Sequence, residues 1–268
     1  MSAISARRFS GALIAVAMSA LAVGCASSNS SSSASNPTSG AATASATSKA
    51  GRAVPTVLAA ASLTKVFPRI DPSAKYTFGG SGALKTEIEQ GAPADVFAAA
   101  SPKQPAALLA KGLVDKPVEF ATNTLVLIVP KSNPAHITSV AQITKPGVKL
   151  VICNATVPCG DYARKAFTNL GITAAALKNV VSQTTDVTQT VAEVATGQAD
   201  AGFVYITDAK AADGKVKAVG LPAQAKPGAQ DFIAVVKAGK NQAAAAFVKE
   251  VLSPAGQAKL KAAGFGQP

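Results

Sequence analysis

The segment KYTFGGSGALKTEIEQGAPADVFAAA, residues 75–100, decides the fold. It begins with the strand-forming run Lys75–Phe78, continues through a Gly-rich turn into the helix-forming stretch Ala83–Gln90, and ends in a second apolar run, Asp95–Ala100. Short apolar runs bounded by Gly or Pro predict strands. A strand, a helix and a strand in this order predict a parallel or mixed sheet with helices on both faces.

The same alternation continues on both sides of this segment. Ser62 is expected to cap a short helix that Pro68 ends, because proline cannot continue a helix. Further strands are expected at Thr56–Ala60, Thr124–Val129, Lys149–Ile152, Ala201–Tyr205, Val216–Gly220 and Phe232–Val236. Further helices are expected at Pro102–Ala110, Tyr162–Leu170, Val187–Thr196, Asn241–Leu252 and Pro254–Ala263.

Two alternating blocks of this kind predict an α/β protein with two lobes, each built on its own sheet. We expect residues 54–123 plus 233–268 to form lobe 1, and residues 124–232 to form lobe 2. Two strands, near Thr124–Leu127 and Phe232–Val235, are expected to cross between the lobes.

The N-terminus predicts export. Residues 1–24 have the pattern of a signal peptide, with Arg7 and Arg8 ahead of an apolar stretch and small residues before Cys25. The end of this pattern, Leu21-Ala-Val-Gly-Cys25, resembles the lipobox of bacterial lipoproteins, which implies lipidation of Cys25. Cleavage as an ordinary secretory peptide is the alternative. Residues 25–53 are rich in Ser, Ala and Thr, and such a composition predicts a flexible linker.

Charge and cysteine usage narrow the classes of function. The net charge is +12, but the lysines are scattered and aromatics make up only 5% of the chain, so we expect no nucleic-acid partner. Cys153 and Cys159 are expected to form a disulfide in an oxidising compartment, and two free thiols are the alternative. His136 is the sole histidine, so we expect no metal bound directly by side chains.

Several strand-to-helix junctions carry only small or hydroxyl residues and no basic side chain. A helix start offers unpaired backbone N–H groups and the positive end of the helix dipole. Such junctions suit a dehydrated anion that must also be released. The junctions are Ala59-Ala-Ala-Ser62, Gly79-Gly-Ser-Gly82, Val157-Pro-Cys-Gly160 and Thr184-Thr-Asp-Val187.

At these junctions the chain resembles the molybdate-binding proteins of ABC importers, over nearly all of residues 55–267. The most specific match is Gly79-Gly-Ser-Gly-Ala-Leu84 followed by Gln90-Gly-Ala-Pro-Ala-Asp-Val-Phe97. Weaker matches are Val57-Leu-Ala-Ala-Ala-Ser-Leu-Thr64, Pro158-Cys-Gly-Asp-Tyr-Ala163, Asp186-Val187 and Gly202-Phe-Val-Tyr205 with Asp208-Ala209. Ser101 stands where the family commonly has Asp, and Asp231-Phe-Ile233 replaces a more usual Tyr-Pro pairing.

The resemblance implies a type II periplasmic-binding-protein fold, in which two mixed sheets flanked by helices are joined by a hinge of two crossing strands. It implies a cleft that binds molybdate, and tungstate by the same donors, with no cofactor and no enzymatic activity. It also implies an ABC permease and its ATPase subunit as partners, and a monomer tethered to the outer face of the cell membrane by lipid on Cys25. The implied donors are the hydroxyl and N–H groups of Ser62 and Ser81, the N–H groups of Cys159 and Val187, and the Tyr205 hydroxyl.

Three other functions remain open from the sequence. A receptor for sulfate, phosphate or an organic solute would share the same architecture. A serine-dependent acyl enzyme would use Ser62-Leu-Thr-Lys65, although no Lys-Thr-Gly partner motif occurs in the chain. An adhesion or structural lipoprotein would bind no ligand in the cleft.

Overall fold

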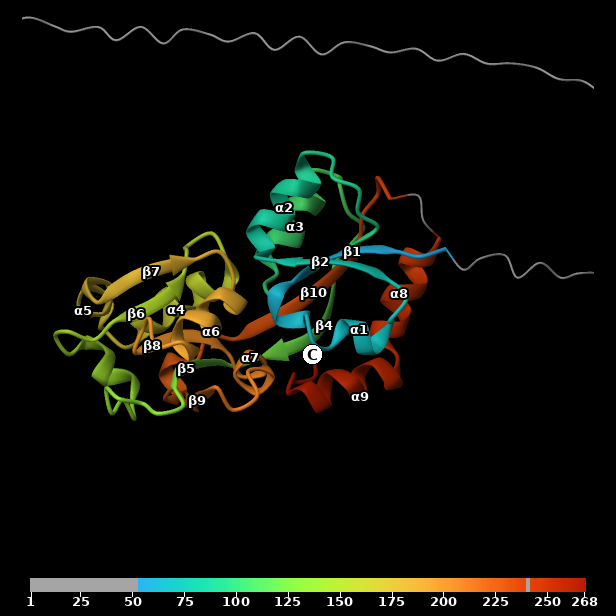
Figure 1. The fold of residues 1–268 in the computed structure, drawn as a ribbon. Coiled ribbons are helices and arrows are strands. Elements are labelled where there is room, and N and C mark those ends of the chain that lie inside the picture. Colours follow the sequence, from blue (N-terminus) through green and yellow to red (C-terminus); the bar gives the residue numbers. More distant parts are fainter. Residues whose placement is uncertain (1–52, 240–241) are drawn as a thin grey trace, which may run out of the picture. The chain divides into compact units, whose positions relative to one another are not determined.

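The computed structural model describes residues 53–239 and 242–268. The predicted signal peptide, Cys25 and nearly all of the predicted linker lie outside these residues. The described part is α/β and contains two five-stranded mixed sheets, as the alternation of strands and helices predicts (Figure 1). We call each sheet with its helices a lobe.

The first lobe has the strand order β2-β1-β3-β10-β4. Strand β1 lies parallel to β2 and β3, whereas β10 lies antiparallel to β3 and β4. The strands are β1 (Thr56–Ala60), β2 (Lys75–Gly79), β3 (Val96–Ala99), β4 (Val118–Asn123) and β10 (Ala229–Val235). The helices are α1 (Phe67–Ile70), α2 (Ser81–Glu89), α3 (Lys103–Ala110), α8 (Ala243–Leu252) and α9 (Pro254–Ala263), with a 3-10 turn at Ala61–Leu63.

The second lobe has the strand order β7-β6-β8-β5-β9. Strand β6 lies parallel to β7 and β8, and β5 lies antiparallel to β8 and β9. The strands are β5 (Leu125–Pro130), β6 (Leu150–Cys153), β7 (Val180–Thr184), β8 (Ala201–Tyr205) and β9 (Val216–Val219). The helices are α4 (Pro158–Asn169), α5 (Thr173–Lys178), α6 (Val187–Ala195) and α7 (Ile206–Ala211), with 3-10 turns at Val140–Thr144 and Ala223–Ala225.

The first sheet is covered on both faces. Successive side chains of a strand point to opposite sides of the sheet, so neighbouring residues of β1 pack against different helices. On β1, Leu58 packs in one cluster with Leu84 of α2 and Leu108 of α3. Its neighbour Val57 belongs to the cluster on the other face, where Phe67 lies. Figure 1 shows α2 and α3 on one side of this sheet and α1 and α9 on the other.

The aromatic core is divided between the lobes. In the first lobe Phe67 contacts Phe120 and Phe247, with ring centroids 5.8 and 5.5 Å apart. In the second lobe Phe167 meets Phe203 edge-on at 5.1 Å. Each lobe therefore has its own group of packed rings, and burial of such rings is a main source of stability.

The chain passes between the sheets twice, at Thr124 and over residues 220–228. At the first crossing Asn123 accepts a hydrogen bond from the Thr124 N–H through Oδ1 and donates one to Thr207 through Nδ2. This side chain therefore fixes the point at which β4 of one sheet becomes β5 of the other.

Two sequence expectations differ from the structure. Pro68 was expected to end a helix, but it lies in the first turn of α1, where its missing N–H would have no partner. Ser62 is not a side-chain cap either, since it lies within the 3-10 turn and makes no capping hydrogen bond. In addition β4, β7 and α5 were not anticipated.

Candidate anion-binding site

A small cavity lies between the two lobes, where strands end and helices begin. All the residues expected from the sequence as oxyanion donors line it together: Ser62, Ser81, Cys159, Val187 and Tyr205. The volume open to the centre of a water molecule is about 10 Å³, roughly that of a single water site. The small size of this cavity suits a compact ligand, such as an ion, better than a sugar or a peptide.

Three helix starts contribute backbone donors to the cavity. Ser81 is the first residue of α2, Val187 is the first of α6, and Cys159 follows Pro158 at the start of α4. The N–H groups of a first helical turn have no carbonyl partner within the helix, and they carry the positive end of its dipole. The three starts therefore supply unpaired donors and partial positive charge to one place.

The hydroxyl groups in the cavity lack acceptors. Among the described residues, Ser62 Oγ and Tyr205 Oη are buried and have no hydrogen-bond partner. Ser81 Oγ accepts from the Ala100 N–H at 3.2 Å, which leaves its own hydrogen free to donate. An unsatisfied buried polar group costs about 1–3 kcal/mol. These hydroxyls are therefore poised for a ligand that accepts hydrogen bonds.

The cavity offers donors without a counter-ion. No Lys or Arg is among its lining residues in the part of the chain that the structure describes. Asp186, which lines it, is occupied as the cap of α6, where its Oδ1 accepts from the Gln189 N–H at 3.1 Å. Burial raises the pKa of Tyr205 well above its usual value. The phenol therefore keeps its proton and remains a donor.

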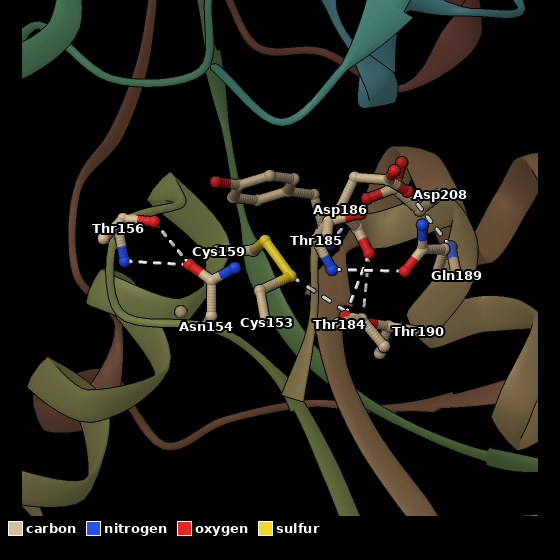
Figure 2. Close-up of a disulfide and its surroundings, with 12 residues drawn as sticks. Cys153, Asn154, Thr156, Cys159, Thr184, Thr185, Asp186, Gln189, Thr190 and Asp208 are labelled. Atoms are coloured by element: carbon tan, nitrogen blue, oxygen red, sulfur yellow. Dashed lines mark hydrogen bonds between the residues drawn. A yellow bond between two sulfur atoms is a disulfide. The ribbon is translucent and has the colours of Figure 1, made fainter. Parts of the chain in front are cut away.

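A disulfide braces the second-lobe side of the cavity. Cys153 at the end of β6 is joined to Cys159 at the start of α4, as expected from the sequence. Figure 2 shows this bridge, with Cys153 Sγ 3.7 Å from the hydroxyl of Thr190. Thr190 in turn shares a 2.6 Å hydrogen bond with Thr184. The start of α4 is therefore tied to β6, and β6 is tied to α6.

Two buried acids, Asp208 and Asp231, act electrostatically on Tyr205. Neither is among the donors expected from the sequence. Asp208 accepts from the Tyr205 N–H at 2.9 Å, and burial raises its pKa to about 7. Asp231 is 1% exposed and neither carboxylate oxygen has a partner among the described residues. Burial raises its pKa well above the usual range, with smaller contributions from Asp208 and Glu119. An acid in a strand that is apolar except for Gln230 was the signal that could have identified Asp231.

The enzyme alternative would need Lys65 to act on Ser62, but Lys65 is exposed and does not line the cavity that holds Ser62 and Ser81. His136 is exposed in the loop after β5 and does not line the cavity, so it cannot serve as a base for Ser62 or Ser81.

Within the described residues, no group of three or more His, Cys, Asp or Glu side chains could hold a metal ion. No helix within residues 53–239 and 242–268 is both long and apolar enough to cross a membrane.

The family follows from comparison with known proteins. Residues 55–266 match the model of a family described as bacterial extracellular solute-binding protein. The chain belongs to this family. It is therefore a solute-binding component of transport and not an enzyme, and members of this family act outside the cytoplasm.

Several known proteins are similar to this chain over most of its length. The molybdate-binding protein ModA of Mycobacterium tuberculosis is 39% identical over 223 residues, which make up 79% of this chain and 84% of that protein. ModA of Haemophilus influenzae is 32% identical, over 78% of this chain and 89% of its own. Among solved structures, the periplasmic molybdate-binding protein of Azotobacter vinelandii has a TM-score of 0.68 at 25% identity, and covers 80% of this chain and 99% of its own.

Similarity of fold alone extends to receptors of other solutes. The sulfate-binding protein SubI of Mycobacterium tuberculosis has the same TM-score, 0.68, at only 18% identity. These neighbours establish the fold as that of type II periplasmic binding proteins, which confirms the fold class predicted from the sequence. They do not decide the solute.

Proposed function

We propose that this protein captures molybdate, and tungstate through the same donors, and delivers it to an ABC permease driven by an ATPase subunit. The ligand lies in the cavity between the lobes, and the lobes close over it. Support comes from the residues that line the cavity and from the molybdate-binding names of relatives with up to 39% identity.

One observation carries the proposal: the expected donors line one cavity together, and none of the described residues that line it is basic. The hydroxyls of Ser62, Ser81 and Tyr205 and the N–H groups of Cys159 and Val187 surround this space. A tetrahedral dianion presents four oxygen acceptors, and each must find a donor because a charged ligand is costly to desolvate. Fixed dipoles and O–H donors stabilise the charge, yet release the anion more readily than a buried Lys or Arg would.

Selection among tetrahedral dianions rests on size in this account, because their charges are similar. Molybdate and tungstate are nearly the same size, whereas sulfate is smaller and leaves some donors out of reach. Isothermal titration calorimetry of the full-length protein with molybdate, tungstate, sulfate and phosphate tests this directly. We expect molybdate and tungstate to bind with similar affinity and sulfate to bind much more weakly. Sulfate or phosphate binding as tightly as molybdate would refute the choice of solute.

We also propose that the protein acts as a monomer at the outer face of the cell membrane, held there by lipid on Cys25. The support is the signal-peptide pattern of residues 1–24 and the lipobox-like sequence that ends at Cys25. Mass spectrometry of the membrane-derived protein should find a lipid on an N-terminal Cys25. The Cys25→Ala variant should be recovered in the soluble exported fraction. Equal membrane retention of both forms would refute the lipid tether.

A further inference from the structure

Gly80 and Gly82 flank the donor Ser81, and the backbone of the opposite lobe lies directly against both. A Cβ atom added at Gly82 would lie 2.6 Å from the carbonyl oxygen of Thr156. A Cβ at Gly80 would overlap the carbonyl oxygen of Thr185 and lie 3.2 Å from Val157 Cγ1. These neighbours are mainly backbone atoms, which cannot rotate away as the end of a flexible side chain can.

Backbone conformation does not explain why glycine occupies these positions. Gly80 has φ −66° and ψ 128°, which any residue adopts. Gly82 is the second residue of α2, and a helical backbone does not require glycine. Close approach of another chain segment is the remaining physical reason for glycine. The approaching segments belong to the second lobe.

The two contacts lie beside the anion donors. Thr156 lies just before the start of α4, which presents the Cys159 N–H, and Thr185 lies just before α6, which presents the Val187 N–H. Their carbonyls meet α2 at the residues on either side of Ser81. The distance between first-lobe and second-lobe donors therefore depends on how closely these carbonyls approach α2.

We propose that Gly80 and Gly82 are positioning residues that set how far the lobes close, and hence the size of the oxyanion cage. Without side chains at these two positions, Thr185 and Thr156 can seat against α2, so that Ser81, Cys159 and Val187 reach the same anion. A methyl group at either position holds the lobes apart and leaves every donor chemically intact. This inference rests on the proposed function, since it concerns the same cavity.

Single alanine substitutions in the full-length protein provide the test. Gly80→Ala and Gly82→Ala should each weaken molybdate binding by roughly 30-fold or more, because donors to a charged ligand move out of reach. Small-angle X-ray scattering should show that molybdate compacts the wild-type protein and fails to compact either variant. Without anion, Gly82→Ala should unfold at the same temperature as wild type or higher, because alanine favours the helix.

Gly220→Ala is the matched control. Gly220 is exposed and does not line the cavity, and its added Cβ would meet no atom within 4 Å. It should bind molybdate within about threefold of wild type and compact normally, since no contact with the other lobe changes.

The outcomes separate this inference from the proposed function. Wild-type affinity and compaction in both variants would overturn the inference, as would a loss of anion-free stability in both, which would show a role within one lobe. A wild-type protein that compacts with sulfate or phosphate but not molybdate would refute the proposed solute, and the same variants would then be titrated with that anion. A wild-type protein that no anion compacts would overturn both.

Discussion

On the first-lobe side the cavity wall is made of short side chains at the ends of β1 and β2, whereas on the second-lobe side it is held by covalent and polar ties. Ser62 and Ser81 stand among Ala and Gly residues. Across from them, the Cys153–Cys159 disulfide secures one helix start, and the acid Asp208 supports the backbone of Tyr205. The first wall therefore supplies hydroxyls on short serine side chains, whereas the second wall holds the backbone of Cys159 and Tyr205 through the disulfide and Asp208.

The buried acid Asp208 of the second wall should make the free energy of unfolding depend strongly on pH. The pKa of Asp208 is raised from 3.8 to about 7, so the folded state binds this proton more tightly than the unfolded state. This contribution is fully present below about pH 4 and is lost as the pH rises through about 7, a change of about 4 kcal/mol.

Urea unfolding of wild type and Asp208→Asn between pH 4 and pH 8 measures this effect. The variant should become more stable relative to wild type as the pH rises, because its amide has no charge to bury. A stability difference that stays constant across this range would show that Asp208 is not a buried, destabilised acid.

The disulfide should contribute the next largest effect. Closing its small loop, with a sequence separation of 6, is expected to stabilise the protein by about 2 kcal/mol through the entropy of the unfolded chain. The double variant Cys153→Ser, Cys159→Ser should lose this amount and should also bind molybdate more weakly, because the Cys159 N–H is less fixed. Wild type in reducing agent is the matched control and should behave like the variant. Unchanged affinity in both would show that the bridge is not needed to hold that donor.

Removal of single hydroxyl groups should affect stability differently at Ser81, whose hydroxyl accepts a hydrogen bond, and at Ser62 and Tyr205, whose hydroxyls have no partner among the described residues. Tyr205→Phe and Ser62→Ala should each weaken molybdate binding by about 1.5–3 kcal/mol, with no loss of anion-free stability from a broken hydrogen bond. Ser81→Ala should weaken binding by about 1–3 kcal/mol and also lower anion-free stability, since the Ala100 N–H loses its acceptor. Calorimetry and thermal unfolding of the three variants measure both quantities. Equal stability losses in all three would contradict this distinction.

The smallest effect on molybdate affinity is expected from the exposed ion pair between the two lobes. Lys103 of the first lobe lies 3.5 Å from Asp161 of the second, but the lysine side chain is 70% exposed. Exposed ion pairs contribute about 0–1 kcal/mol and are screened by salt. Lys103→Ala should therefore change molybdate affinity by less than about threefold at physiological salt. A tenfold loss would show that this pair, and not the glycine contacts, holds the lobes closed.

Much of the fold could be predicted from the sequence where apolar runs meet strong breakers. The bounds of β1, β8 and α9 are those expected, because each is flanked by Pro or Gly or by a charged turn. The strands β4 and β7 were missed, and both lie at the edge of a sheet. An edge strand is less buried, so its sequence carries less of the apolar pattern that predicts a strand.

The candidate site also has parts that the sequence predicts and parts that it does not. Tyr205 was expected only from the resemblance to the family. The other residues expected as donors could be placed near the cavity from the sequence, because each belongs to a local junction between a strand end and a helix start. The buried pair of Asp208 and Asp231 and the seating of Gly80 and Gly82 could not. They depend on the register between distant strands and on the approach of two lobes, neither of which local sequence encodes.

The most direct test is a crystal structure of the protein with molybdate, in which anomalous scattering locates the molybdenum. We expect one molybdate in the cavity between the lobes. Its oxygens should lie about 2.7–3.1 Å from the Ser62, Ser81 and Tyr205 hydroxyls and from the Cys159 and Val187 nitrogens, with no Lys or Arg in contact. Molybdate bound elsewhere, or held by a basic side chain, would contradict it.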